Sequence, residues 1–127
     1  MTLNSVNNAF LDALDAVVPK DVLRPVETRY TEEPRGMFKG QGAILALPRT
    51  VEDVAALIRT ANAFSVPVVP YGGGTGLVGG QVMPGDTAPM ILSLERMSAI
   101  RGVYPQENVV VAEAGAILSD VQSAALS

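Results

Sequence analysis

The chain of 127 residues is long enough to bury the core of one domain, and 48% of its residues are apolar. Its net charge of −4 and its scattered basic residues exclude a nucleic-acid-binding module, which would neutralise phosphates with clustered Lys and Arg. The absence of Cys and His excludes disulfides, thiolate nucleophiles, zinc sites of the Cys/His type and an imidazole general base.

The sequence carries no signal for a membrane anchor or for export. No apolar run is long enough to cross a bilayer, and residues 1–10 carry no Lys or Arg ahead of an apolar stretch. A cytoplasmic protein is therefore the default expectation. Because the commonest catalytic side chain is missing, any demanding chemistry is expected to come from a cofactor or from residues elsewhere.

The N-terminal third is expected to form one helix and an irregular arm. Apolar residues recur at helical spacing over residues 4–17, and Pro19 ends the run. Residues 20–42 are polar and interrupted by Pro and Gly, which predicts an arm or surface loop over a neighbouring element.

A strand–helix–strand unit is the best-specified part of the chain. Residues 43–47 form a short apolar run suited to a buried strand, and Thr50 can cap a helix whose apolar stripe ends at Phe64. The acidic residues 52 and 53 belong to the start of this helix, where its dipole favours them. A second strand at residues 67–70 completes about thirty residues, the length of a βαβ unit with a parallel pair.

Three further strands and a helix are expected in the last third. Residues 90–93 predict a third strand, and residues 100–104 and 109–113 predict a hairpin joined by a polar turn. A final helix is predicted over residues 117–126. The sequence ends inside this pattern, so we expect an incomplete domain.

The second strand leads directly into a glycine-rich loop. Six glycines fall among the ten residues 71–80. Glycine suits positions where φ is positive or where the backbone approaches a ligand closely, and consecutive free amides form an anion nest suited to phosphate. A flexible connector is the plainer alternative, but connectors favour Ser and Gly without an apolar strand leading into them.

Two nucleotide-binding motifs can be rejected for this loop. Residues 74–79 match G-x-G-x-x-G, but that fingerprint needs a helix that begins at the loop, and residues 80–85, Gly-Gln-Val-Met-Pro-Gly, cannot hold one. A P-loop is excluded because no Lys follows the glycines.

Several motifs at fixed spacing are more specific than the glycines alone. They are Leu47-Pro48-Arg49-Thr50-Val51-Glu52-Asp53-Val54, Ile58-Arg59, Asn62, Pro67-Val68-Val69-Pro70, the glycines from Gly72 to Gly80, Ile91-Leu92-Ser93-Leu94-Glu95-Arg96-Met97 and Glu113-Ala114-Gly115. Together they closely resemble the FAD-linked oxidases of the vanillyl-alcohol oxidase or PCMH type, from roughly Arg35 to the end. Within that family they are most similar to the glycolate oxidase catalytic subunit and the flavin-dependent D-lactate dehydrogenases.

The resemblance implies an α+β fold, the N-terminal part of a PCMH-type FAD-binding domain. A small parallel three-stranded βαβ lobe would be followed by the start of an antiparallel lobe, with the cofactor between them. We therefore expect an N-terminal helix and arm at residues 1–42 and an incomplete FAD-binding domain at residues 43–127. Its first lobe would span residues 43–97 and the start of its second lobe residues 98–127.

The resemblance also implies how FAD would be held. Backbone amides of the glycine loop would bind the pyrophosphate. Some relatives attach flavin covalently through a His where this chain has Thr75, so FAD is expected to be noncovalent here. The expected cofactor-binding residues are Pro48, Tyr71, Gly72, Gly73, Gly74, Thr75, Gly76, Leu77, Gly79 and Gly80.

Two of these residues have a second interpretation. Pro48 would pack near the adenine or would simply end the first strand before the helix cap. Tyr71 would stack on a ring of the cofactor or would cover the core.

Two groups of charged residues outside the glycine loop are expected to be structural. Glu95-Arg96 is expected to form a polar turn between the lobes, and Glu113 is expected to have a structural role. Arg35 is left unassigned.

The implied parent activity is oxidation of a D-2-hydroxy acid of the glycolate or lactate type by hydride transfer to FAD. We expect a small hydroxy acid to bind only the full-length parent, and we assign neither a catalytic residue nor a metal site to this chain. The alternative is a noncatalytic truncated lobe. It would act as an interaction or dimerisation module through the face that truncation exposes, because unpaired sheet edges invite pairing.

Overall fold

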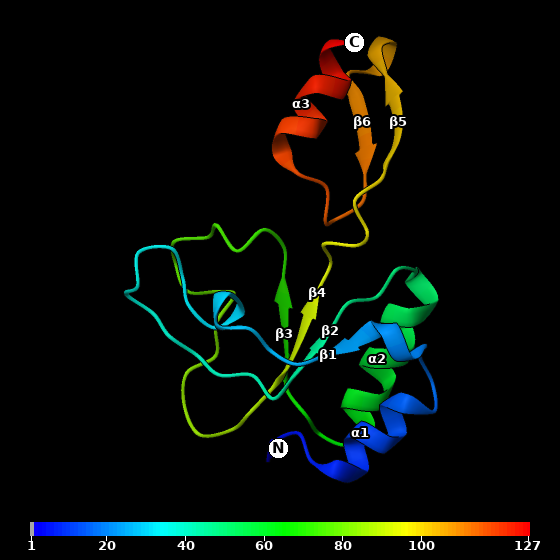
Figure 1. The fold of residues 1–127 in the computed structure, drawn as a ribbon. Coiled ribbons are helices and arrows are strands. Elements are labelled where there is room, and N and C mark those ends of the chain that lie inside the picture. Colours follow the sequence, from blue (N-terminus) through cyan, green and yellow to red (C-terminus); the bar gives the residue numbers. More distant parts are fainter. Residues whose placement is uncertain (1) are drawn as a thin grey trace.

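A computed structural model describes residues 2–127 and shows two lobes joined by a short connection at residues 94–99 (Figure 1). The larger lobe contains a four-stranded sheet with two helices, and the smaller contains a two-stranded hairpin with one helix. The elements in chain order are α1 (Asn8–Asp15), η1 (Lys20–Val22), β1 (Leu23–Arg24), η2 (Thr28–Tyr30), β2 (Ile44–Ala46), α2 (Val51–Ala63), β3 (Val68–Tyr71), β4 (Met90–Ser93), β5 (Ile100–Tyr104), η3 (Pro105–Glu107), β6 (Val109–Ala112) and α3 (Leu118–Leu126).

The main sheet has the strand order β1-β2-β4-β3, and β4 pairs in parallel with both β2 and β3. The expectation that the two strands flanking α2 form a direct pair is therefore wrong, because β4 lies between them. All four residues of β4 are buried. A strand covered on both faces reads as a continuous apolar run, and Met90-Ile91-Leu92 is such a run.

The arm contributes an edge strand that the sequence did not predict. In β1, Leu23 and Arg24 pair antiparallel with Ala46 and Leu45 of β2. Two residues are too few to show a period-two pattern, and Pro25 follows them directly. The expectation of an entirely irregular segment at residues 20–42 is therefore wrong at this point.

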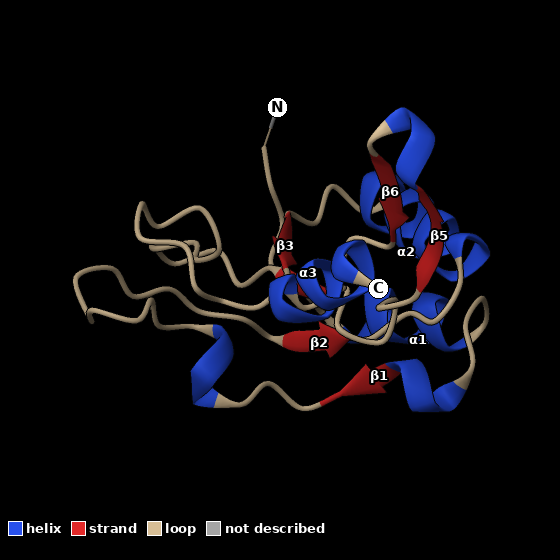
Figure 2. Ribbon diagram, turned by 90° about the horizontal axis from the view of Figure 1, so that it is seen from above, coloured by secondary structure: helices blue, strands red, loops and turns tan. Residues whose placement is uncertain are grey.

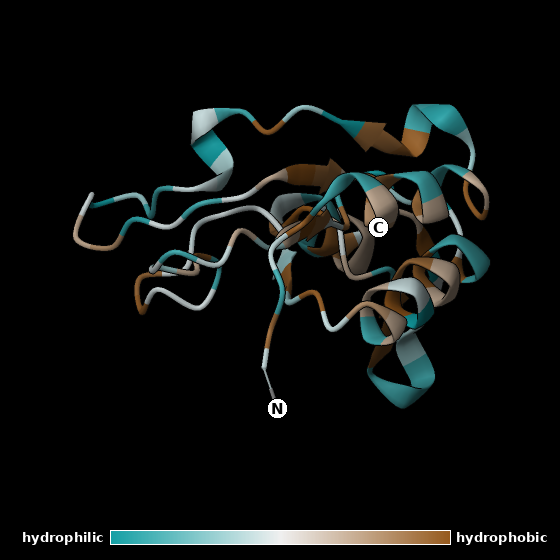
Figure 3. Ribbon diagram, turned by 90° about the horizontal axis from the view of Figure 1, so that it is seen from below, coloured by the Kyte–Doolittle hydropathy of each residue, from teal (hydrophilic) through white to brown (hydrophobic). Residues whose placement is uncertain are grey.

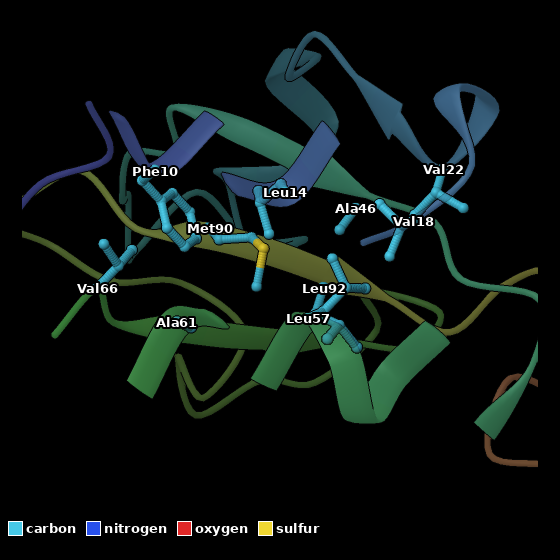
Figure 4. Packing of buried hydrophobic residues seen from close by; sticks show 10 residues of the cluster. All are labelled: Phe10, Leu14, Val18, Val22, Ala46, Leu57, Ala61, Val66, Met90 and Leu92. Carbon is cyan, nitrogen blue, oxygen red and sulfur yellow. The ribbon is translucent and has the colours of Figure 1, made fainter. Parts of the chain in front are cut away.

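Both helices of the larger lobe pack on one face of the main sheet. Phe10 and Leu14 of α1 meet Leu57 of α2 over Met90 and Leu92, which alternate toward this face of β4 (Figure 4). The ring of Phe10 also lies edge-on against that of Phe64, with 5.7 Å between the centroids. This face forms the principal apolar core.

Capping residues set the start of both helices. The Asn7 side chain accepts a hydrogen bond from the Phe10 amide at 2.9 Å, so α1 begins later than expected. Thr50 caps α2 as predicted, since its hydroxyl accepts from the Asp53 amide at 3.1 Å. The Asp53 carboxylate in turn accepts from the Arg49 amide at 3.3 Å.

The opposite face of the sheet is covered by loops and the short helix η2 rather than by α-helices. Figures 1 and 2 show the long loops on the side away from α1 and α2. Tyr30 of the arm packs edge-on against Tyr71 at 4.8 Å between ring centroids, in a second apolar cluster with Leu45, Val69 and Ile91. In Figure 3 β2 is brown and β1 is only partly brown, whereas the loops are mostly pale or teal.

The smaller lobe contains the expected hairpin and final helix. β5 and β6 pair antiparallel, with an irregularity between Ile100 and Gly102, and Asn108 adopts a left-handed φ of 57° in the turn. Gly115 returns the chain to the junction, where its amide donates to the Met97 carbonyl at 2.9 Å and a Cβ would collide with the Leu94 carbonyl. Within residues 2–127, no residue after position 97 is buried, and no helix is long and apolar enough to span a membrane.

A substitution at Leu57 tests whether the sheet face covered by α1 and α2 forms the principal core. It is fully buried, so we expect Leu57→Ala to lower the free energy of unfolding by about 2–5 kcal/mol. The neighbouring Ile58 is 45% exposed, and Ile58→Ala should cost less than about 1 kcal/mol. Chemical denaturation of both variants measures the difference, and equal losses would contradict this packing.

Candidate cofactor site at the glycine loop

The glycine loop lies in the connection between two parallel strands. Because β3 and β4 run in the same direction, residues 72–89 must bring the chain back along the sheet before β4 begins. They do so without any helix. A Rossmann fingerprint needs a helix at the glycines, so the rejection of that motif is confirmed.

Buried side chains support the loop from beneath. The Tyr71 hydroxyl donates to the Arg29 carbonyl at 3.1 Å and lies so close to Gly74 that a Cβ there would collide with it. Gly74 also has a left-handed φ of 73°. On the other side, Gln81 is buried and its amide donates to the Gly76 carbonyl at 2.8 Å. The backbone of the loop is therefore fixed at both points.

The opposite side of the loop is open. Cβ atoms at Gly72 and Gly73 would meet no atom within 4 Å. Within residues 2–127, the backbone amides of residues 72–76 donate no hydrogen bond. A row of free amides on a backbone without side chains is an anion nest, which suits a phosphate group.

This open side faces a pocket of about 700 Å³ between the two lobes. Gly72, Gly73 and Thr75 line it from the loop, Arg29 lines it from the arm, and residues 114–118 line it from the smaller lobe. At this volume the pocket can receive more than a phosphate, and residues far apart in the sequence form its walls. This open, concave backbone fits a diphosphate-containing cofactor.

The structure does not bring all the expected cofactor residues to the pocket wall. Pro48 is fully buried at the end of β2, and Tyr71 is only 6% exposed and covers the core. Leu77 is about half exposed, and Gly79, with a left-handed φ of 78°, packs against the ring of Phe38. Gly74, Gly76 and Gly80 lie along the loop outside the lining residues.

A cluster of charged residues lies beside the pocket. The Tyr30 hydroxyl donates to Glu95 Oε1 at 2.5 Å, and the Ser93 hydroxyl donates to the same oxygen at 2.9 Å. Arg29 contacts the Tyr30 hydroxyl and lies 3.4 Å from Glu95 Oε2 and 3.3 Å from Glu27. Glu95-Arg96 forms the expected polar turn, and Arg96 donates to the Asp21 carbonyl at 2.7 Å.

These contacts shift the pKa of the groups involved. Burial, reinforced by the hydrogen bond to Glu95, raises the pKa of Tyr30 to about 12. Burial alone would raise the pKa of Glu95, but hydrogen bonds from Tyr30 and Ser93 and the charge of Arg29 outweigh it, so its pKa is below the ordinary value. Glu95 is thus a carboxylate at neutral pH, and Arg29 balances its charge.

Sequence reasoning missed Arg29 and Gln81 at this site. Arg29 lies in the arm, with no motif around it, and only the fold brings it to the glycines. Gln81 follows the last glycine directly, but a single Gln in a loop gives no pattern that would predict a buried support.

The FAD binding domain family matches residues 42–126, which include the glycine loop and the pocket residues of the smaller lobe. The chain belongs to this family. FAD is the cofactor that the match indicates, and the resemblance to FAD-linked oxidases is thereby confirmed. Glu113 and Gly115, which carry part of that resemblance, lie at the junction of the lobes, where Glu113 forms an ion pair with Arg101 at 3.5 Å.

Proteins similar to this chain include some that are named as hydroxy-acid dehydrogenases. The chain is 32% identical over 122 residues to a D-lactate dehydrogenase of Anaerostipes hadrus. The aligned region covers 93% of this chain and 25% of that protein. It is 42% identical over 81 residues to a D-2-hydroxyglutarate dehydrogenase of Xanthomonas citri pv. viticola, covering 64% and 17%. The chain thus spans a quarter or less of the curated relatives described here.

Solved structures show the same fold at lower identity. An alkyldihydroxyacetonephosphate synthase matches with a TM-score of 0.78 and 19% identity, over 98% of this chain and 25% of that one. The glucose dehydrogenase Phl p 4.0202 matches with a TM-score of 0.73 and 15% identity, over 94% and 26%. The expected fold class, the N-terminal part of a PCMH-type FAD-binding domain, is confirmed.

Titration tests the Tyr30–Glu95 hydrogen bond. The folded state holds the Tyr30 proton more tightly than the unfolded chain, so this group adds stability below about pH 10 that is lost as the pH rises toward about 12. Glu95→Gln removes the charged acceptor, and we expect the pKa of Tyr30 to fall while burial keeps it above 10.0. Tyrosinate absorbance measures this, and Tyr30→Phe identifies its signal among the three tyrosines. Identical titrations of wild type and Glu95→Gln would contradict the contact.

Proposed function

We propose that this chain is the N-terminal FAD-binding part of a flavin-dependent oxidoreductase that oxidises a D-2-hydroxy acid by hydride transfer to FAD. The row of free amides at residues 72–76 carries the proposal, with Gly72, Gly73 and Thr75 on the wall of the pocket between the lobes. The relatives named D-lactate and D-2-hydroxyglutarate dehydrogenase support the substrate class. Bound FAD would supply the redox chemistry, because its ring system accepts a hydride.

The proposed role of the chain is to bind and orient the cofactor. The diphosphate of FAD carries two negative charges, and N–H groups that donate to charged oxygens make strong hydrogen bonds. Arg29 is the cation on the pocket wall, but Glu27 and Glu95 share its charge, so backbone amides would provide most of the binding. The diphosphate ligands would be the amides of Gly72, Gly73, Gly74, Thr75 and Gly76, with Gly79 and Gly80 toward the ribityl and ring end. Leu77 would also contact the cofactor.

Tyr71 and Pro48, the remaining predicted residues, would not contact the diphosphate in this proposal. Tyr71 would act from beneath, by holding Gly74, and Pro48 would pack near the adenine from the end of β2. Residues 43–97 and 98–127 would form the two walls, and residues 1–42 would support the first of them. A small hydroxy acid would bind only in the full-length protein, and no catalytic residue is assigned to this chain.

Gly73 allows a sharp test of FAD binding. A side chain at Gly73 would point into open space, so Gly73→Val should leave the unfolding transition nearly unchanged while it blocks the diphosphate. We expect FAD affinity to fall about tenfold or more, which corresponds to roughly 1.4 kcal/mol. Titration of the purified chain with FAD, followed by flavin fluorescence, measures the change.

Ala63→Val is the matched control, because it adds the same side chain to an exposed position at the end of α2, away from the carboxyl end of β3. It should bind FAD like the wild type. Equal affinity of the Gly73→Val chain and the wild type would rule out the loop as the diphosphate site.

Noncovalent attachment gives a separate prediction. The chain has no His and no Cys, and the loop carries Thr75, so no side chain of the usual kind is available to attach flavin. After acid precipitation of the FAD-loaded chain, we expect all flavin absorbance in the supernatant. Flavin retained in the washed protein pellet would refute the noncovalent assignment.

An interaction or dimerisation module is the second candidate function. The smaller lobe supports it, since Val109 and Val111 are about 40% exposed, and Ile117 and Leu118, which also line the pocket, are 64% and 70% exposed. An apolar face of this kind suits another protein surface or a second copy of the chain. FAD uptake separates the two candidates, because only the first requires it.

A cytoplasmic location also remains a prediction, which cell fractionation would test.

A further inference from the structure

We propose that Glu33 and Arg35 are positioning residues that hold the distal half of the glycine loop in shape and thereby set the affinity for FAD. The inference rests on the proposed function, because it concerns the same cofactor. It assigns a role to a part of the arm that no motif identified.

The two residues lie in a short hairpin at residues 31–40. Glu32 and Lys39 form an antiparallel bridge, the Glu33 amide donates to the Phe38 carbonyl at 3.2 Å, and the Gly40 amide donates to the Thr31 carbonyl at 2.8 Å. At the tip, Gly36 has a left-handed φ of 68°. The hairpin is thus a defined structure rather than a loose loop.

Glu33 is the buried centre of this hairpin. Its side chain is fully buried, and its Oε1 accepts from the Met37 amide at 2.6 Å. Its Oε2 has no hydrogen-bond partner and lies 3.8 Å from Arg35 Nε. A buried carboxylate is costly unless a cation compensates its charge. Arg35 is that cation, so Glu33 fixes the direction of the Arg35 side chain.

The far end of Arg35 reaches the glycine loop. Its Nη2 donates to the Leu77 carbonyl at 2.7 Å, across 42 positions of sequence. The ring of Phe38 lies against Gly79, where a Cβ would be only 3.1 Å from the ring. Two contacts from the hairpin therefore hold residues 77–79, while Tyr71 and Gln81 hold the part nearer β3.

This arrangement favours a positional role over an electrostatic one. Glu33 balances the charge of Arg35, so the pair adds little attraction for an anion. A loop without helix or strand loses conformational entropy when it binds a ligand, and contacts that order it beforehand raise affinity. Lys39 provides the comparison, because it is a cation on the same hairpin but pairs with Glu32 at 3.8 Å and not with the glycine loop.

The test compares Arg35→Ala with Lys39→Ala in the full chain. Both variants lose one positive charge from the hairpin, but only Arg35→Ala loses the contact with Leu77. We expect Arg35→Ala to weaken FAD binding about tenfold, as the loss of one charge-assisted hydrogen bond implies, and Lys39→Ala to change it less than about twofold. Equal weakening by both variants, or no weakening by Arg35→Ala, would overturn the proposal.

Hydrogen exchange without FAD gives a readout that does not depend on cofactor binding. The Val82 amide, which donates to the Gly79 carbonyl at 3.2 Å, should exchange faster in Arg35→Ala than in wild type or Lys39→Ala. Glu33→Gln keeps the acceptor for Met37 but removes the charge that directs Arg35, and it should also speed exchange in the loop. If the wild type takes up no FAD but these exchange differences appear, the proposed function fails. The role of Glu33 and Arg35 in holding the glycine loop is then still supported. If hydrogen exchange in the glycine loop is unchanged in both Arg35→Ala and Glu33→Gln, the proposal that these residues hold the loop is wrong.

Discussion

The parallel pairing of β3 with β4 is the constraint on which the candidate site depends. The chain that leaves β3 must return along the sheet before β4 can begin, and residues 72–89 do this without a helix. Their amides therefore lack helical partners at the carboxyl end of β3, the end at which open parallel sheets bind ligands. A loop of this kind needs support from elsewhere, and Tyr71, Gln81 and the hairpin at residues 31–40 provide it.

The second constraint is electrostatic, because an acidic chain with a net charge of −4 must receive an anionic cofactor. The cations near the loop are already paired, Arg29 with Glu95 and Arg35 with Glu33. Their carboxylates hold them in place and cancel most of their charge. Binding then depends on oriented backbone dipoles, whose geometry is set by the buried groups beneath the loop. The same design explains why small changes beneath or beside the loop are expected to affect affinity.

The elements with strong local signals could be predicted from the sequence. Thr50 and its helix, the apolar strand at residues 90–93 and the glycine loop all follow from periodicity, capping or composition. The central position of β4 could not be predicted, because local patterns do not specify which strands become neighbours. Arg29 was missed for a related reason, since its place beside Gly72 exists only in the folded chain.

The central claim is that the free amides of residues 72–76 bind the diphosphate of FAD, and amide chemical shifts test it most directly. The isotope-labelled chain would be titrated with FAD, with ADP, which shares the diphosphate, and with riboflavin, which lacks it. The account predicts that FAD and ADP shift the amide signals of these five residues and that riboflavin leaves them in place. Shifts of equal size with riboflavin, or shifts confined to other parts of the chain, would contradict it.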